Sequence, residues 1–354
     1  SDEVIFSFPR HDDEKKDERI LTPSPLIVDF PQSELILPTY KSHRDLIHQA
    51  GQIESIEDNK APELDQAALN GGTSVIKNQA ACPFRAFALH RLGAKGLESP
   101  HTGLNAMERG ELVHGVLEQV WRELKTKNEL DAISDDKLKE KLSNSAKKVI
   151  ERIQTKRATK LSKRFTNIEN QRLVRLTYEW LDKEKKRGDF RVKGIEVEGE
   201  INIGGLSLTT RLDRVDMLND GRLIIIDYKT GESKITTMCG ERPDEPQLPL
   251  YLLASQSDAA SAVVFAQVKM GKMKFKALAR DNDLLPSVKA DPEWEQLIVS
   301  WRTDLTRIAE SFSKGDAKVS PKKYPETCRN CDLEPFCRIS ERTEDAYVES
   351  EDGA

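Results

Sequence analysis

The sequence predicts an α/β fold of the α+β-like kind, in which helices precede a run of antiparallel strands and a helix, a strand and a further helix follow it. Three observations support this prediction. Residues 206–231 alternate and turn like a β-hairpin, residues 104–127 and 292–313 carry apolar stripes of helical period, and residues 262–268 form another apolar strand. The sequence contains no internal repeat.

The composition describes a heavily charged chain that is long enough for one large or two ordinary domains. It has 354 residues, of which 32% are charged and 37% hydrophobic. No apolar run approaches the roughly 20 residues of a membrane span, and the N-terminus lacks a secretory signal pattern. Five cysteines, an odd number, fit a disulfide framework poorly and favour a reducing cytosol. We therefore expect a cytoplasmic protein without membrane contact.

Shifts in composition divide the chain into three predicted parts. Residues 1–72 form an N-terminal segment that ends in a polar linker, closed by two glycines. Residues 73–340 form the main domain, and residues 341–354 form an acidic tail that we expect to be disordered.

The main domain begins with helical segments. Thr73 or Ser74 can cap a helix that ends at Ala81, and Pro83 interrupts it before a second short helix. Cys82 lies at this junction.

The apolar stripe of residues 104–127 predicts a helix with His114 beside the centre of the stripe. Gly110 and Gly115 flank this histidine, and glycine inside a helix costs about 1 kcal/mol relative to alanine. We therefore expect another part of the chain to approach the helix closely here. On the local pattern alone, His114 is a partly buried histidine that makes one hydrogen bond.

A basic segment contrasts with the acidic balance of the whole chain. Residues 137–193 hold 19 Lys or Arg against 7 Asp or Glu, whereas the chain has a net charge of −5. Residues 135–188 read as two or more long helices. Such a segment is either a phosphate-binding surface or a solvated helix face, and the sequence leaves both readings open.

The hairpin brings charged side chains together. Its second arm is a continuous apolar run that predicts a strand covered on both faces, and Asn219-Asp220-Gly221 predicts a three-residue turn. Pairing symmetric about Asp220 places Asp213 opposite Asp227, with Lys229 on the same face. Facing carboxylates destabilise a sheet, and a divalent cation would remove the repulsion. The alternative is an exposed face whose charges form salt bridges.

Two further groups of residues are candidates for metal binding. Cys328, Cys331 and Cys337 lie within ten residues of one another, and such clusters usually bind metal, although three thiolates leave one position short. The acids at 196, 198 and 200 share one face of a strand predicted for residues 195–203. One of them can join a metal site, but exposed acids of an edge strand are the commoner case.

Spaced motifs in one order resemble those of the PD-(D/E)xK nuclease superfamily, in particular RecB/AddB-type nuclease domains with a four-cysteine iron–sulfur cluster. The resemblance runs from about Ser74 to Arg338, and Thr210 stands where glycine is usual. The motifs are Cys82-Pro83-Phe84-Arg85, Arg109-Gly110 with His114, Leu212-Asp213-Arg214-Val215-Asp216, Asp227-Tyr228-Lys229-Thr230-Gly231, Gln247 with Tyr251, and the three late cysteines.

The resemblance implies a restriction-endonuclease-like core with a mixed central sheet flanked by helices. It implies that His114, Asp213, Asp227 and the backbone carbonyl of Tyr228 hold Mg²⁺ or Mn²⁺. Lys229 then orients a water molecule, and Gln247 and Tyr251 grip the nucleic-acid strand. Arg85 and Arg214 are lesser candidates for phosphate contact.

The resemblance also implies that Cys82 joins Cys328, Cys331 and Cys337 around a [4Fe–4S] cluster, with zinc as the alternative. Such a cluster would staple the N- and C-terminal ends of the domain together, and Cys239 is left as an ordinary thiol. Residues 1–50 resemble the tail of a helicase-like region, which suggests the C-terminal part of a larger protein.

The implied function is that of a metal-dependent nuclease that hydrolyses DNA, expected to be an exonuclease on single-stranded or unwound DNA in double-strand-break repair. A helicase subunit or domain is the expected partner. The alternative is an inactive nuclease fold that serves as a DNA-binding structural module of a repair complex.

Overall fold

The computed structural model describes residues 4, 6–8, 21–31, 42–50, 58–64, 72–96, 101–157, 159–255 and 259–341. Contacts divide the chain into two units, Ser1–Glu57 and Asp58–Ala354. The first unit contains helix α1, His43–Gln49. Apart from Glu341, the predicted acidic tail lies outside the described residues.

Residues 58–64, part of the predicted linker, are paired with the chain that follows the last long helix of the second unit. The backbone N–H of Ala61 donates to the carbonyl of Gly315 at 2.7 Å, and that of Ala317 donates to Asn59 at 2.9 Å. The boundary between the units therefore falls at Glu57, ahead of the two glycines that close the predicted linker.

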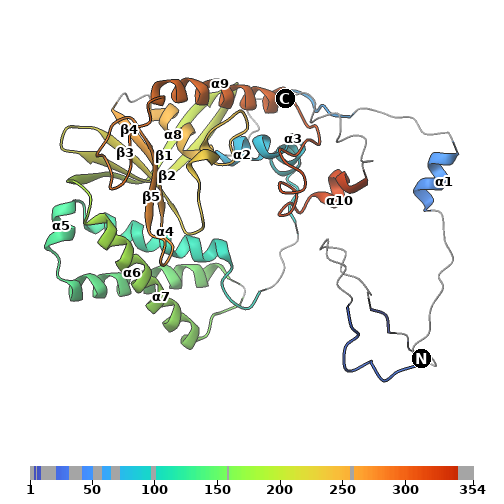
Figure 1. Ribbon diagram of the computed structural model, residues 1–354, viewed down its shortest axis with the longest axis horizontal. Coiled ribbons are helices and arrows are strands. Elements are labelled where there is room, and N and C mark those ends of the chain that lie inside the picture. Colours follow the sequence, from blue (N-terminus) through green and yellow to red (C-terminus); the bar gives the residue numbers. More distant parts are fainter. Residues whose placement is uncertain are drawn as a thin grey trace. The chain divides into compact units, whose positions relative to one another are not determined.

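The second unit consists of helices arranged around one sheet (Figure 1). Among the described residues, no helix is both long and apolar enough to cross a membrane. The helices are α2 (Ser74–Ala81), α3 (Pro83–Ala86), the π-helix η2 (Phe87–Arg91), α4 (Ala106–Glu123), α5 (Lys127–Ala132), α6 (Asp135–Lys156), α7 (Lys163–Glu184), the 3₁₀ helix η3 (Ile235–Met238), α8 (Gln247–Ser255), α9 (Trp294–Ser313), α10 (Glu334–Cys337) and the 3₁₀ helix η4 (Ile339–Glu341).

The sheet has five strands in the order of the sequence, β1-β2-β3-β4-β5. Strands β3 and β4 pair in parallel and the other neighbours are antiparallel, so the predicted mixed sheet flanked by helices is confirmed. A parallel pair requires a crossover, and α8 lies in the chain that makes it. The strands are β1 (Phe190–Ile203), β2 (Leu206–Leu218), β3 (Leu223–Lys229), β4 (Ala260–Gln267) and β5 (Lys274–Ala279).

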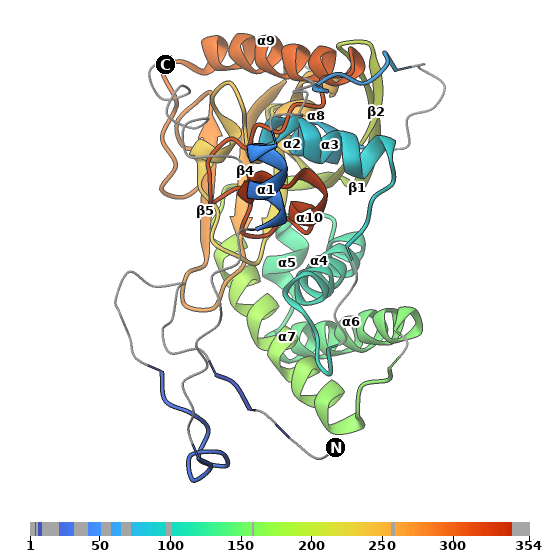
Figure 2. The same cartoon turned by 90° about the vertical axis from the view of Figure 1, so that its right-hand side faces the viewer.

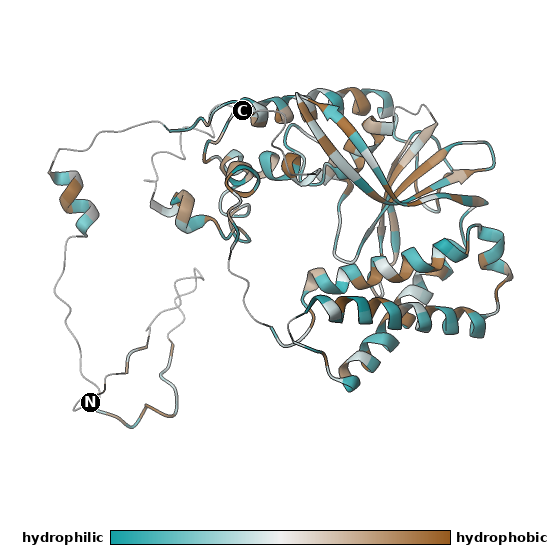
Figure 3. Cartoon of the chain, turned by 180° about the vertical axis from the view of Figure 1, so that it is seen from behind, coloured by the Kyte–Doolittle hydropathy of each residue, from teal (hydrophilic) through white to brown (hydrophobic). Residues whose placement is uncertain are grey.

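Each face of the sheet is covered by its own apolar layer. One layer joins the sheet to α4, α6 and α7, and the other joins it to α2, α8 and α9 (Figures 1 and 2). Side chains of β3 alternate between the layers, with Ile224 and Ile226 in the first and Leu223 and Ile225 in the second. The apolar colouring of the inner strands in Figure 3 follows from this burial on both faces.

The register of the hairpin agrees with the prediction. Arg214 pairs with Ile226, and Gly221 adopts a φ of 89° in the turn, a conformation that glycine takes without strain. Continuing this register by one residue places Asp213 opposite Asp227. The relative position of the two aspartates therefore follows from the sequence pattern.

Close approach beside His114 is also confirmed. A Cβ atom on Gly115 would lie 2.7 Å from a methyl group of Val149 in α6, and one on Gly110 would lie 3.4 Å from the hydroxyl of Thr230. Gly115 thus lets α4 pack tightly against α6, whereas a Cβ atom on Gly110 would make an ordinary contact just beyond the end of β3.

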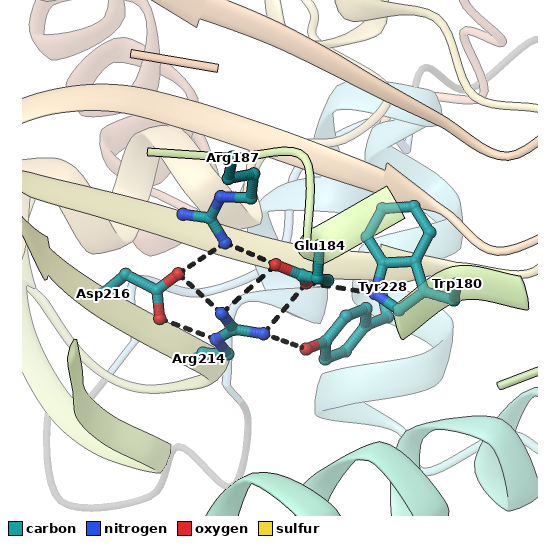
Figure 4. Close-up of polar contacts among 6 residues, drawn as sticks. All are labelled: Trp180, Glu184, Arg187, Arg214, Asp216 and Tyr228. Atoms are coloured by element: carbon teal, nitrogen blue, oxygen red, sulfur yellow. Dashed lines mark hydrogen bonds and ion pairs between the residues drawn. The ribbon is translucent and has the colours of Figure 1, made fainter. Parts of the chain in front are cut away.

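A buried cluster of four charged side chains joins the end of α7 to β2 (Figure 4). Arg214 donates to Asp216 at 2.6 and 2.7 Å and to Glu184 at 3.0 Å. Arg187 reaches the same two carboxylates, at 2.8 Å from Asp216 and 2.6 Å from Glu184. All four side chains are almost fully buried. Because water does not solvate them, each charge is compensated only by the opposite charges beside it.

The cluster also reaches β3. Arg214 donates to the hydroxyl of Tyr228 at 3.0 Å, and its guanidinium lies 3.9 Å from the ring centroid of Trp121. Arg214 is 1% exposed, so the expectation that it contacts phosphate is wrong. The sequence did not reveal that α7 supplies a carboxylate partner, Glu184, for this arginine.

We expect Arg214→Met to lower the free energy of unfolding by about 3–5 kcal/mol, because Glu184 and Asp216 lose a cation in a buried site. Urea denaturation followed by tryptophan fluorescence measures the change. Arg222→Met is the matched control, since Arg222 pairs with Asp220 at the partly exposed hairpin turn, where an ion pair contributes about 0.2–1 kcal/mol. Equal losses in the two variants would contradict the prediction.

Candidate active site

Two aspartates meet where β3 ends. Asp213 Oδ2 accepts the backbone N–H of Tyr228 at 2.7 Å, which ties β2 to β3 just beyond the last ladder pair. Asp227, the residue before Tyr228, is only 3% exposed. The hairpin thus brings two carboxylates to one place by backbone pairing, as its sequence predicts.

His114 approaches the pair from α4. Its Nδ1 lies 3.3 Å from Asp213 Oδ2, and its ring meets the ring of Tyr228 edge-on with centroids 5.9 Å apart. Burial alone would lower the pKa of His114, but the hydrogen bond and the charges of Asp213 and Asp227 raise it overall. Burial alone would raise the pKa of Asp213, but His114 and the N–H of Tyr228 lower it.

Lys229 stands between two carboxylates. Its Nζ lies 2.9 Å from Asp227 Oδ2 and 3.2 Å from Glu245 Oε2. Burial would lower the pKa of Lys229, but these two anions raise it to about 12. The ammonium is therefore charged at every physiological pH.

The ionised form of Asp227 is electrostatically unfavourable in the folded protein. Burial, together with the nearby Asp213, raises its pKa to about 6 despite the cations beside it. Lys229 forms an ion pair with the buried Oδ2 at 2.9 Å, and no other donor among the described residues reaches this oxygen. A buried acceptor next to a second carboxylate suits a divalent cation, since Mg²⁺ and Mn²⁺ prefer oxygen ligands. Within the described part of the chain, however, no three His, Cys, Asp or Glu side chains already form a metal-holding group.

The other predicted site residues lie around this centre. Gln247, at the start of α8, donates from Nε2 to the backbone carbonyl of Arg211 at 2.8 Å, two residues before Asp213. Tyr251, one helical turn later, is partly buried against the apolar layer of α8 and α9. Gln247 therefore supports the strand that carries Asp213, which the motif spacing did not reveal.

Glu196 also belongs to the surroundings of the paired aspartates. This residue has a φ of 50° in β1, its side chain is 13% exposed, and it forms an ion pair with Arg211. Burial, with further contributions from Asp213 and Glu118, raises its pKa. These three acids and His114 line one narrow depression. Alternation along the strand did not distinguish Glu196 from its exposed neighbours at 198 and 200.

The cysteines lie where the two ends of the domain meet. Burial, together with Cys331, Cys82 and Cys337, raises the pKa of Cys328 to about 11. Among the described residues, however, these cysteines do not form a group that could hold a metal ion. Phe84 contributes to this junction: its N–H donates to the Lys318 carbonyl at 3.0 Å, and its ring meets that of Phe336 edge-on. The fifth cysteine, Cys239, lies apart from this group, directly after η3.

The basic segment forms α6 and α7, as predicted. The C-terminal end of α6 reaches the first half of α4, where Lys156 pairs with Glu111 at 2.9 Å and Arg157 pairs with Glu108. His114 lies one turn further along α4. Basic side chains of α6 therefore extend to within a helical turn or two of the candidate site.

Comparison with known proteins identifies the class to which this fold and site belong. A family model described as the PD-(D/E)XK nuclease superfamily matches residues 73–338. The chain therefore belongs to the PD-(D/E)XK nuclease superfamily.

The individual proteins that match the chain have low sequence identity to it. An ATP-dependent helicase/deoxyribonuclease subunit of Clostridium perfringens, from three strains, is 25% identical over 253 residues, which cover 64% of this chain and 21% of the relative. The chain thus spans about a fifth of the length of these relatives. A crystal structure from Eubacterium rectale, provisionally named an exonuclease, aligns over 77% of this chain and 88% of its own with 11% identity and a TM-score of 0.39.

With a chelator present, we expect the contribution of Asp227 to the free energy of unfolding to fall as the pH rises from about 4 to about 6 and this carboxyl ionises. Its folded pKa of about 6 exceeds the reference value of 3.8, so the folded state binds more protons in this window. Relative to wild type, Asp227→Asn should gain up to about 3 kcal/mol between pH 4 and pH 7. Urea denaturation over a pH series measures this difference.

Asp220→Asn is the control for this prediction. Hydrogen bonds from Arg222 lower the pKa of Asp220, so the stability that Asp220 contributes is lost as the pH falls, which is the opposite dependence. An Asp227→Asn variant whose stability stays parallel to wild type between pH 4 and pH 7 would show that this carboxylate is not destabilised in the folded protein.

Proposed function

We propose that the chain is a metal-dependent nuclease that hydrolyses phosphodiester bonds of DNA. The observation that supports this proposal best is the position of Asp213 beside a buried Asp227, with the ammonium of Lys229 2.9 Å from Asp227 Oδ2. A protein that used this hairpin only for stability would have no need to bury facing carboxylates. Membership of a nuclease superfamily supports the same reading.

Asp213, Asp227 and His114 would hold Mg²⁺ or Mn²⁺, with the backbone carbonyl of Tyr228 as a further ligand. Such a metal supplies an activated water molecule and stabilises negative charge on the scissile phosphate. His114 and the N–H of Tyr228 already hold the Asp213 carboxylate in place, so its orientation does not depend on the metal.

Lys229 would stabilise the charge that develops on the phosphate. Its ammonium is always protonated and lies beside Asp227, so it can orient the attacking water and neutralise a pentacovalent phosphate. Gln247 and Tyr251 would contact the strand near the cut, and Arg85 remains a candidate for phosphate contact.

The basic helices α6 and α7 would bind the phosphate backbone without reading its sequence. Exposed lysines on α6 support this role, because the same helix ends against the turn of α4 that precedes His114. A strand bound along α6 would thus reach the paired aspartates.

We further propose an exonuclease that acts on single-stranded or unwound DNA in double-strand-break repair, in the cytoplasm and together with a helicase subunit or domain. The weak similarity to a helicase/deoxyribonuclease subunit supports this role. An inactive nuclease fold that serves as a DNA-binding module is the alternative, and the presence of Asp213, Asp227 and Lys229 in one place argues against it.

We also propose that Cys82, Cys328, Cys331 and Cys337 bind a [4Fe–4S] cluster, with zinc as the alternative. The mutual influence of the four thiols and the meeting of the domain's ends at Phe84 support this proposal. Because hydrogen bonds also join these ends, loss of the cluster should loosen the junction without separating it.

Asp213→Ala should lower the rate of Mg²⁺-dependent digestion of end-labelled single-stranded DNA by about a hundredfold or more, because it removes both a metal ligand and the partner of His114. Digestion with and without a chelator measures the effect. Asp220→Ala, in the turn of the same hairpin, should digest DNA like wild type. Absence of cleavage in all three proteins, with DNA binding retained, would support the inactive binding module instead.

Anaerobically purified protein should be coloured and carry about four iron atoms per chain. Cys331→Ser should lose this iron, because it removes one ligand, whereas Cys239→Ser should keep it, because Cys239 lies apart from the four thiols. Visible absorption and metal analysis make the comparison. A colourless protein with stoichiometric zinc would refute the iron–sulfur assignment.

A further inference from the structure

Glu245 links the candidate site to a neighbouring helix. Its Oε2 lies 3.2 Å from Nζ of Lys229, and its Oε1 lies 2.5 Å from Nζ of Lys77 in α2. With Asp227, these residues form a row of alternating charges that ends at the paired aspartates. The sequence motifs did not single out this glutamate.

The segment that carries Glu245 is firmly anchored. The N–H of Glu245 donates to the Thr237 carbonyl at 2.9 Å, so its backbone position is fixed. Other hydrogen bonds hold the flanking residues to α2, to α9 and to the chain near Ser320. They are Arg242 to the carbonyls of Ala80, Ala81 and Ser320, Trp301 to that of Met238, and Arg307 to that of Glu241. Glu245 is thus presented by a rigid support.

Lys229 needs such a support. A lysine side chain has many rotamers, and its ammonium is a point charge without preferred direction. With Asp227 as its only partner, the ammonium would be held from one side alone. Glu245 contacts it from a second side, so Lys229 is shared between two carboxylates, 2.9 Å from Asp227 Oδ2 and 3.2 Å from Glu245 Oε2.

We propose that Glu245 is a positioning residue for Lys229. It holds the ammonium in one position between the two carboxylates, ready for a phosphate. This inference rests on the proposed nuclease function. Lys77 is the outer partner, and its pairing with Oε1 keeps the other oxygen of Glu245 directed at Lys229.

Glu245→Gln tests the proposal, because glutamine keeps the shape of the side chain and removes its charge. We expect kcat for Mg²⁺-dependent digestion of single-stranded DNA to fall about tenfold to a hundredfold, with KM for DNA unchanged within about twofold. Glu245→Asp, which keeps the charge on a shorter stem, should recover part of the loss. A Glu245→Gln variant with wild-type kcat would overturn the proposal.

Asp244→Asn is the matched control. Asp244 is the adjacent acid and pairs with Lys322 at 2.9 Å at an exposed position, so its neutralisation removes the same charge from the same segment. This variant should digest DNA like wild type. A loss equal to that of Glu245→Gln would show that only the net charge of the segment matters, and would overturn the positioning role.

Thermal unfolding of Glu245→Gln, Lys229→Met and the double variant separates this inference from the proposed function. If the two side chains hold each other, the double variant should have a Tm close to that of Lys229→Met, whereas additive losses would overturn the inference. A wild-type protein that cleaves no DNA would refute the nuclease function, and the unfolding cycle would still decide whether Glu245 restrains Lys229.

Discussion

The buried pairing of Arg214 with Glu184 and Asp216 is the interaction on which the rest of the site depends. It fixes the end of α7 against β2, and through the Tyr228 hydroxyl it fixes the same tyrosine whose N–H holds Asp213. A buried ion cluster contributes little net stability compared with apolar packing of equal volume, but it is strongly directional. We infer that its value here lies in specifying one arrangement of β2 and β3.

That arrangement supports a centre that is itself unfavourable. Burial and the neighbouring carboxylate raise the pKa of Asp227, and the surrounding apolar layers on both faces of β3 prevent the strand from relaxing away from Asp213. The domain is large enough for its cores to offset such a cost, whereas an isolated hairpin would not be. The buried ion cluster and the apolar layers thus stabilise the fold, whereas the paired aspartates destabilise it. Such a division is typical of functional sites, where residues needed for activity are often unfavourable for stability.

The features that follow from local periodicity are those that the sequence predicts correctly. The alternation of β2 and the glycine turn determine the register, so the position of Asp213 opposite Asp227 follows from the sequence alone. The short edge strand β5 and the small helix α5 are not predicted, because a few residues carry too little periodic signal. The predicted phosphate contact of Arg214 is wrong because its buried partner Glu184 is 30 residues away, and only tertiary packing brings the two together.

The charges around the paired aspartates explain how metal and substrate would depend on each other under the proposed function. Asp213 already has His114 and Asp227 already has Lys229, so the protein largely neutralises its own carboxylates. A divalent cation added to this balanced set leaves an excess of positive charge, which a phosphodiester would neutralise. Each would therefore bind more tightly in the presence of the other. The cations beside the two aspartates thus lessen their repulsion in the absence of DNA without removing the cost of burying Asp227. Under the proposed function, the site would attract metal more strongly once a phosphate is bound.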